Sequence, residues 1–358
     1  MGIFRKLDRM QTMKEIPTRT IVTSEIEKVL FYQIKPETLT FFRDIGISGV
    51  PSVADTPHYK FARSILENGR QASSSEEELY RNYLQASWAG KNGDIEDRIN
   101  KFADHLNLFV SSRSTSAPLL TTFLGDNDLY AVDGNHRLAF SLATNRNLEV
   151  KIAPFNKALK IFNPMKEYYG QGNKGKPYQS IYFNKRMVVT GRRVDLIERL
   201  NLIPTEAING MEILDIASNF GMSSIMANIN GAKKCTGIER SKELVNFSNK
   251  MSILHAREKS VHFLQHDIDH PEKPISGFYD TAFAFSIYSH LKNKKNLFEI
   301  IEKCIKKYVI FETHPHTKIE DYPELFDSKK FRSCDFLGNL NYSYDRPEKC
   351  RGLYILTK

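Results

Sequence analysis

The sequence predicts an α/β protein of two domains, with a mixed α/β domain over residues 1–165 and a doubly wound parallel sheet over residues 166–358. A chain of 358 residues with 41% hydrophobic residues is longer than one ordinary domain and can fill two cores. In its C-terminal half, apolar runs of strand length alternate with segments of helical period. Residues 168–176, with three glycines among polar side chains, are typical of a domain boundary.

Charge and cysteine content narrow the class of protein only slightly. The formal net charge of +9 suits a nucleic acid, a phosphorylated glycan, a nucleotide or an anionic membrane surface. Because the basic residues are spread along the chain, a solvated basic face is favoured over a dedicated nucleic-acid stripe. The four cysteines form no CxxC pair, so we expect neither a metal site nor disulfides. With no run of about 18 apolar residues and no apolar signal core, we expect a soluble, cytoplasmic protein.

The N-terminal half contains segments of both periods. We expect helices at residues 24–34, 59–66, 76–84 and 137–144, and strands at residues 129–132 and 148–153.

The C-terminal half alternates strands and helices more regularly. We expect strands at residues 212–216, 234–238, 261–265, 281–285 and 308–311, and helices at residues 194–202, 223–230, 241–255 and 296–306.

Ligands of such a sheet bind at the carboxyl ends of the strands, so the residues that follow each strand are the candidates. The first strand leads into a turn of small residues that ends at Gly221 and lets the backbone approach a ligand. The second ends at Glu239, whose carboxylate suits a ribose diol. The third ends near Asp267, which suits an adenine amine.

This pattern resembles the class I methyltransferases that use S-adenosylmethionine (AdoMet), over residues 178–358. The resemblance implies a Rossmann-like methyltransferase sheet in which Asp215 orients the methionine portion of AdoMet. It departs from the family at Ala217, where glycine is usual. Residues 177–181 and 190–195 also resemble the lead-in of O-antigen chain-terminating methyltransferases, which implies that Arg193 meets the cofactor carboxylate. The implied cofactor-binding residues are Tyr178, Gln179, Arg193, Asp215, Ala217, Asn219, Gly221, Glu239, Asp267 and Ser286. A nucleotide-binding domain of another type and an inactive methyltransferase remain as alternatives.

The end of the fourth strand indicates which atom is methylated. Residues 285–290 read FSIYSH and contain neither the Pro-Pro-Tyr signature of amino-methylating DNA enzymes nor a Pro-Cys nucleophile. This favours an oxygen acceptor on a glycan, phosphate or small molecule over a DNA base. His290 is the candidate general base because imidazole titrates near neutrality, and His314 and His316 follow the last predicted strand.

A second motif lies in the N-terminal half, where residues 130–139 read YAVDGNHRLA. A glycine turn before a helix N-terminus, with a guanidinium beside it, suits phosphate. The motif resembles the Asp-Gly-x-His-Arg box of the ParB/sulfiredoxin-like superfamily, which implies nucleotide binding and, in some members, kinase activity with ATP and magnesium. The implied residues are His58, Asp133, Gly134, Asn135, His136 and Arg137, with Asp133 and His136 as catalytic candidates. The other interpretation is that His136 and Arg137 only cap and brace a helix.

These two resemblances predict a bifunctional enzyme of surface glycan modification, in which one domain phosphorylates an acceptor and the other methylates it. A nucleic-acid or nucleotide-binding N-terminal module that recruits a methyltransferase is the alternative. The sequence disfavours it because no recognition helix and no interleaving of aromatic and basic residues is present.

Overall fold

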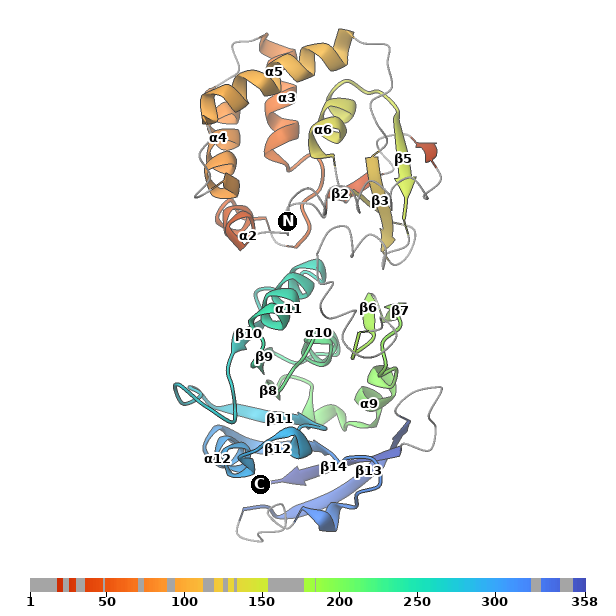
Figure 1. The fold of residues 1–358 in the computed structure, drawn as a ribbon, viewed down its shortest axis with the longest axis vertical. Coiled ribbons are helices and arrows are strands. Elements are labelled where there is room, and N and C mark those ends of the chain that lie inside the picture. Colours follow the sequence, from red (N-terminus) through yellow and green to blue (C-terminus); the bar gives the residue numbers. More distant parts are fainter. Residues whose placement is uncertain are drawn as a thin grey trace. The chain divides into compact units, whose positions relative to one another are not determined.

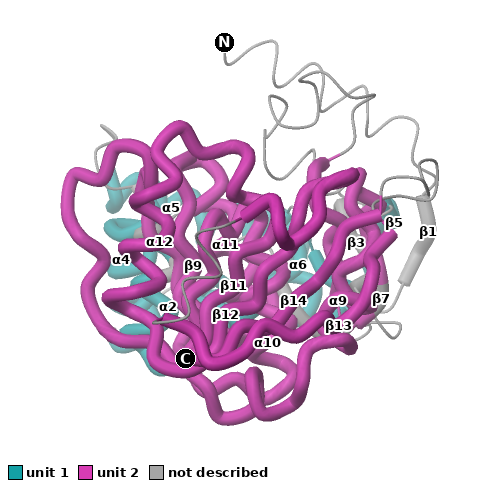
Figure 2. The backbone as a smooth tube through the Cα atoms, turned by 90° about the horizontal axis from the view of Figure 1, so that it is seen from below, with its two compact units in different colours: residues 1–167 teal, residues 168–358 magenta. Residues whose placement is uncertain are grey.

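The computed structural model divides the chain into two compact units, residues 1–167 and 168–358 (Figure 2). The structure describes residues 18–21, 26–29, 36–47, 49–69, 74–88, 94–111, 119–124, 128–131, 134–153, 177–183, 185–322, 330–341 and 350–358. None of the helices in these residues is long and apolar enough to cross a membrane.

The described part of the N-terminal unit combines a mixed sheet with a group of helices (Figure 1). Its sheet has the order β1-β5-β3-β4-β2, and its core includes Phe61, Tyr80, Phe102 and Leu138. The strands are β1 (Thr18–Ile21), β2 (Ile26–Val29), β3 (Leu119–Leu124), β4 (Asp128–Ala131) and β5 (Leu148–Ile152). The helices are α2 (Pro36–Asp44), α3 (Pro57–Asn68), α4 (Ser74–Trp88), α5 (Ile95–Ser111) and α6 (Asn135–Ala143).

One predicted element of this unit is wrong. Residues 24–34 were expected to form a helix, but Ile26–Val29 is strand β2, which pairs in parallel with β4. The β-branched Ile26 and Val29 favour an extended backbone, and pairing with β4 outweighs the helical spacing of the apolar residues. The rest of this predicted helix lies outside the described residues.

The C-terminal unit contains a seven-stranded, mostly parallel sheet of order β10-β9-β8-β11-β12-β14-β13 (Figure 1). Strands β8 to β12 are parallel, and β14 is antiparallel to β12 and β13. The strands are β8 (Glu212–Ile216), β9 (Lys234–Glu239), β10 (Val261–Gln265), β11 (Tyr279–Phe285), β12 (Ile305–Glu312), β13 (Ser333–Asn341) and β14 (Cys350–Thr357). The helices are α9 (Leu196–Leu202), α10 (Met222–Ile229), α11 (Lys242–Leu254) and α12 (Lys294–Cys304), and β6 (Ile181–Phe183) pairs with β7 (Arg186–Val189).

The chain runs outward from β8 to β10 and then returns to β11 on the other side of β8. This reversal is the switch point at which Rossmann-like sheets bind ligands, at the carboxyl ends of the strands. The central strands are buried, with Leu214, Phe283 and Val309 fully covered. A core of this kind fixes the strand ends and the loops that follow them.

Helix α12 ends two residues earlier than the sequence predicts. The helix was expected to include Ile305 and Lys306, but both belong to β12. The Lys358 ammonium donates to the carbonyl oxygens of Ile301, Glu302 and Ile305 at 2.6, 3.0 and 2.7 Å. These contacts satisfy carbonyl groups that a helix end leaves without backbone partners.

Candidate active site

The turn between β8 and α10 has an unusual backbone. Ala217, Asn219 and Gly221 all have positive φ angles, of 60°, 53° and 72°. The turn is held by Ser218 N, which donates to the Ile238 carbonyl at 3.0 Å, and by Gly221 N, which donates to the Ser218 carbonyl at 2.9 Å. The left-handed φ at Ala217 explains why the methyltransferase pattern favours glycine there, because a side chain costs about 1–2 kcal/mol in this conformation.

Glu239, at the end of β9, is buried and ties this turn to α11. Its Oε2 accepts a hydrogen bond from Asn219 N at 3.1 Å, and its Oε1 accepts one from Ser241 N at 3.0 Å. Ser241 caps α11 by accepting from Leu244 N at 3.3 Å. Each Glu239 oxygen retains a second lone pair, which leaves the carboxylate able to accept from a ribose diol.

Asp215 and Asp267 stand at two further strand ends. Asp215 is buried, and its Oδ2 accepts a hydrogen bond from Ser224 at 2.7 Å. Burial raises the pKa of Asp215 to about 6, against the opposing effects of Ser224 and Arg199. Asp267 is half-buried, and its Oδ1 accepts from Asp269 N at 2.9 Å, which shapes the loop after β10.

The lead-in segment forms a short bridge beside the sheet. Gln179 and Arg193 pair as an isolated parallel bridge, and Arg193 N donates to the Tyr178 carbonyl at 2.8 Å. The Arg192 guanidinium lies 5.1 Å from the centre of the Tyr178 ring. At Gly191 a Cβ atom would come within 2.3 Å of the Gln179 carbonyl carbon, so this approach requires glycine.

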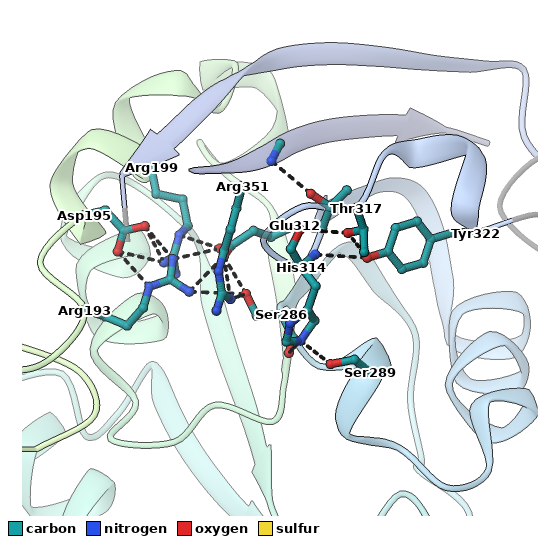
Figure 3. A network of polar contacts seen from close by, with 12 residues as sticks. Arg193, Asp195, Arg199, Ser286, Ser289, Glu312, His314, Thr317, Tyr322 and Arg351 are labelled. Atoms are coloured by element: carbon teal, nitrogen blue, oxygen red, sulfur yellow. Dashed lines mark hydrogen bonds and ion pairs between the residues drawn. The ribbon is translucent and has the colours of Figure 1, made fainter. Parts of the chain in front are cut away.

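The side chain of Arg193 belongs to a buried ion network (Figure 3). It donates to Asp195 Oδ1 at 3.0 Å, to Glu312 Oε1 at 2.8 Å and to Ser286 Oγ at 3.2 Å. Its predicted contact with a cofactor carboxylate stays a prediction. The members of the network are Arg193, Asp195, Arg199, Ser286, Glu312 and Arg351, all less than 7% exposed.

Glu312, at the end of β12, is the central acceptor of this network. The Arg199 Nε lies 3.0 Å from its Oε2, and the Arg351 guanidinium lies 3.2 Å from its Oε1. Burial alone raises the pKa of Glu312, but Arg193, Arg199 and Arg351 outweigh it and hold this pKa well below its usual range. Sequence reasoning missed Glu312, although it ends its strand as Glu239 does.

Ser286 and His290, predicted at the end of β11, lie in one turn. Ser286 has a φ of 56°, and its hydroxyl donates to Glu312 Oε1 at 2.5 Å. His290 is exposed, and its ring centre lies 5.1 Å from that of His314. His316 is exposed as well. The structure therefore brings His290 and His314 together beside the ion network.

Four buried polar atoms, three at the β8 turn and the start of α10 and one in the lead-in segment, lack a hydrogen-bond partner among the described residues. They are Gln179 Oε1, Ser218 Oγ, Asn219 Oδ1 and Ser223 Oγ. A buried polar group without a partner costs about 1–3 kcal/mol, so such a group points to a ligand that completes it. The amide oxygens accept and the serine hydroxyls donate and accept, so these four atoms fit the hydroxyl, amino and carboxylate groups of AdoMet. Ser218 and Ser223 were not singled out in the sequence because serine is common in turns.

In the N-terminal unit, the predicted phosphate motif lies at the start of α6. Gly134 precedes the helix with a φ of 90°, and Asn135 is buried. His136 Nε2 lies 3.3 Å from the Tyr80 hydroxyl, and its ring centre lies 4.7 Å from that of the buried His58. Arg137 is half-buried at the first turn. The structure thus brings His58 and His136 together, whereas Asp133 lies outside the described residues.

The pKa of each imidazole is lowered, which favours its neutral form. Burial lowers the pKa of His136 to about 4, with His105, Arg98 and Arg137 adding to the effect. Burial, and then His136, lowers the pKa of His58 well below its ordinary value. No group of three side chains suited to a metal ion occurs among the residues that the structure describes.

Comparison with solved structures finds AdoMet-dependent methyltransferases that align with about half of the chain. Magnesium protoporphyrin IX methyltransferase from Synechocystis PCC 6803 with bound SAM shares 15% identity, covers 45% of this chain and 76% of its own, and gives a TM-score of 0.36. The N-terminal domain of EvdMO1 in the presence of SAH and D-fucose shares 13% identity, covers 54% and 94%, and gives 0.40. A methyltransferase from Mesorhizobium loti shares 10% identity, covers 46% and 97%, and gives 0.37. No protein-family model and no curated protein sequence matches the chain.

Proposed function

We propose that the C-terminal unit binds AdoMet and transfers its methyl group to an acceptor oxygen. The observation that carries this proposal is the group of buried, unpartnered polar atoms beside the β8 turn, next to Glu239 and at the switch point of the sheet. Three strand ends in a row offer side chains of the type that AdoMet requires. The backbone strain at Ala217 and Asn219 lies at the same place, as is usual at ligand sites.

AdoMet, when bound, supplies a methyl group on a positively charged sulfur that a nucleophilic oxygen attacks. In the proposed site Glu239 holds the ribose, Asp267 meets the adenine, and Asp215 orients the methionine portion. Tyr178, Gln179 and Arg193 close the site from the lead-in. The protein contributes chiefly orientation and exclusion of water, and a base is needed only if the acceptor hydroxyl is un-ionised.

The first test is calorimetric titration of AdoMet into the whole chain. Glu239→Ala removes a charged acceptor of the ribose hydroxyls, so we expect binding about 10–100-fold weaker, from about 1.5–3 kcal/mol for a hydrogen bond to a charged group. Glu299→Gln, on the exposed face of α12, serves as the matched control and should leave the affinity unchanged. If the wild-type chain does not bind AdoMet, the proposal is wrong.

For the acceptor, we propose a sugar hydroxyl or phosphate of a surface glycan, with a small molecule as the broader class. The absence of an amino-methylation signature at residues 285–290 supports oxygen over nitrogen. Transfer of labelled methyl groups to a panel of glycans and phosphosugars tests it. Label in nucleic acid instead would favour the alternative acceptor class.

We further propose that the N-terminal unit is a ParB/sulfiredoxin-like domain that binds a nucleotide, with phosphorylation of the acceptor by ATP and magnesium as its activity. The left-handed Gly134 before α6, with Arg137 in the first turn, supports a phosphate site. Loss of ATP binding in Arg137→Ala, with binding retained in the exposed control Arg63→Ala, is the expected result. Salt-sensitive binding of DNA or RNA would favour a recruiting module instead.

A further inference from the structure

His314, which follows β12, holds the turn that carries His290. Its Nε2 lies 3.2 Å from the Ser286 carbonyl oxygen and also contacts the Ser289 hydroxyl (Figure 3). Since a carbonyl oxygen only accepts, this contact favours a proton on Nε2, with the Ser289 hydroxyl then accepting from the same N–H. The contact with Ser286 therefore selects one tautomer of His314.

The backbone of His314 is held from the other side. His314 N donates to the Tyr322 hydroxyl at 2.9 Å, and Thr317 Oγ1 donates to the His314 carbonyl at 2.7 Å. Thr317 Oγ1 and the Tyr322 hydroxyl lie 2.7 Å apart. His314 is thus fixed at its main chain and at its ring tip, which makes it a rigid contact between the ends of β11 and β12.

His290 differs from His314 in both respects. Its ring is exposed and makes no side-chain hydrogen bond to the residues that the structure describes, while it packs edge-on against His314 with ring planes at 70°. The position of the His290 ring is set by the turn that begins at Ser286, by Ser289 and by the ring of His314. The ring nitrogens of His290 are therefore open to a methyl acceptor, while the ring of His314 packs against it.

We propose that His314 is the positioning residue for His290, and that His290 takes the proton of the acceptor hydroxyl during methyl transfer. The inference rests on the proposed function of the C-terminal unit. The acceptor O–H bond breaks, the proton moves to a ring nitrogen of His290, and the oxygen electron pair forms the new bond to the methyl group. The bond between sulfur and methyl breaks with its electron pair left on sulfur, so charge and atoms balance.

The surrounding charges favour this role. Partial burial, then Arg351 on β14 and Arg240 after β9, lower the pKa of His290, which favours the neutral form that can take up a proton. Burial, Arg351 and His290 lower the pKa of His314, against the opposing effects of the Ser286 carbonyl and Glu312. A proton on either ring therefore disfavours a second proton on the other.

The test is a pH titration of ¹⁵N-histidine-labelled whole chain by long-range ¹H–¹⁵N correlation, with AdoMet calorimetry on the same samples. His314→Gln keeps an N–H donor near the Nε2 position, whereas His314→Asn places its amide near Nδ1 and loses the contact with Ser286. We expect the pKa of His290 to rise in both variants because the neighbouring ring that can carry a like charge is gone, and to rise further in His314→Asn, where the contact with Ser286 is lost as well. In His290→Gln the pKa of His314 should rise because a like-charged neighbour is gone.

An Nδ1–H tautomer of His314 in the wild type would overturn the inference, as would a His290 pKa that is the same in all His314 variants. If His314→Asn fails to fold, Ser289→Ala replaces it; this variant removes one of the two contacts at the ring tip of His314, so a smaller upward change in the pKa of His290 is expected. Failure of the wild type to bind AdoMet removes the proposed function, whereas AdoMet binding with an unresponsive His290 removes only the role of His314.

Discussion

Replacing Glu312 by glutamine should destabilise the C-terminal unit by about 3–5 kcal/mol, the usual cost of leaving buried charges without their partner. Glu312 is 1% exposed and accepts from Arg193 at 2.8 Å and from Ser286 at 2.5 Å. Glutamine keeps the shape of the side chain but turns an NH₂ group toward guanidinium groups. The change therefore removes an attraction and adds a repulsion at a site that water does not reach.

Urea unfolding followed by circular dichroism measures this loss. With an m value of about 2 kcal/mol per molar urea, the midpoint of the C-terminal unit should fall by about 1.5–2.5 M. The single tryptophan, Trp88, belongs to α4 of the N-terminal unit, so its fluorescence transition should stay in place. Glu299→Gln, whose exposed partners are Lys295 and Lys303, should change stability by less than about 0.5 kcal/mol.

The dependence on pH has a definite sign. Because the pKa of Glu312 is lowered in the folded state, its stabilisation is present at neutral pH and is lost as the pH falls from the ordinary glutamate value through the folded pKa. The gap between wild type and Glu312→Gln should therefore shrink in acid. If the two variants, Glu312→Gln and Glu299→Gln, unfold at the same urea concentration at pH 7, the reasoning about the network is refuted.

Three further substitutions test the β8 turn. Ala217→Gly relieves a left-handed φ and should stabilise the unit by up to about 1 kcal/mol after the entropic cost of glycine, as thermal unfolding would show; a lower midpoint would contradict this. Gly221→Ala places a Cβ atom 2.3 Å from the Phe263 ring at a φ of 72° and should destabilise by about 1–3 kcal/mol in the same assay, so an unchanged midpoint would argue against so close an approach of the ring. The pKa of Asp215 is raised to about 6, so wild type should lose about 2 kcal/mol of stability relative to Asp215→Asn as the pH rises from 4 to 6. Urea titrations at each pH measure this difference, and stability curves of the two proteins that stay parallel with pH would rule it out.

Residues 212–216 and 261–265 coincide with β8 and β10, and the elements between them shift by a residue or two. The central strand β8 is predicted well because it is buried, whereas β10, at the edge of the sheet, is marked by the apolar Val261 and Phe263 at alternate positions. Strand β13 was missed because it is an edge strand with mostly exposed side chains, so its apolar pattern is weak. Strand β2 was predicted to be helical because its apolar residues have helical spacing. In so short a segment, pairing with a neighbouring strand, here β4, determines the secondary structure.

The candidate site was predictable where its residues stand at strand ends. Glu239 is the last residue of β9, and Asp267 comes two residues after β10. Because these two strands are parallel, their carboxyl ends lie at the same edge of the sheet. Arg199 and Arg351 carry no such signal, since their partner Glu312 is far away in sequence and only the folded sheet brings them together. The anchoring of His314 depends likewise on a carbonyl oxygen, which a sequence pattern cannot reveal.

The position of β14 has a consequence for synthesis on the ribosome. This strand lies between β12 and β13, although it comes last in the chain, and among the described strands β13 pairs only with β14. A nascent chain that has not reached residue 350 therefore presents an open edge at β12 and lacks Arg351 at the Glu312 carboxylate. Open edges invite pairing with other chains. Formation of β14 thus covers the edge of β12 and delivers the third guanidinium in a single event.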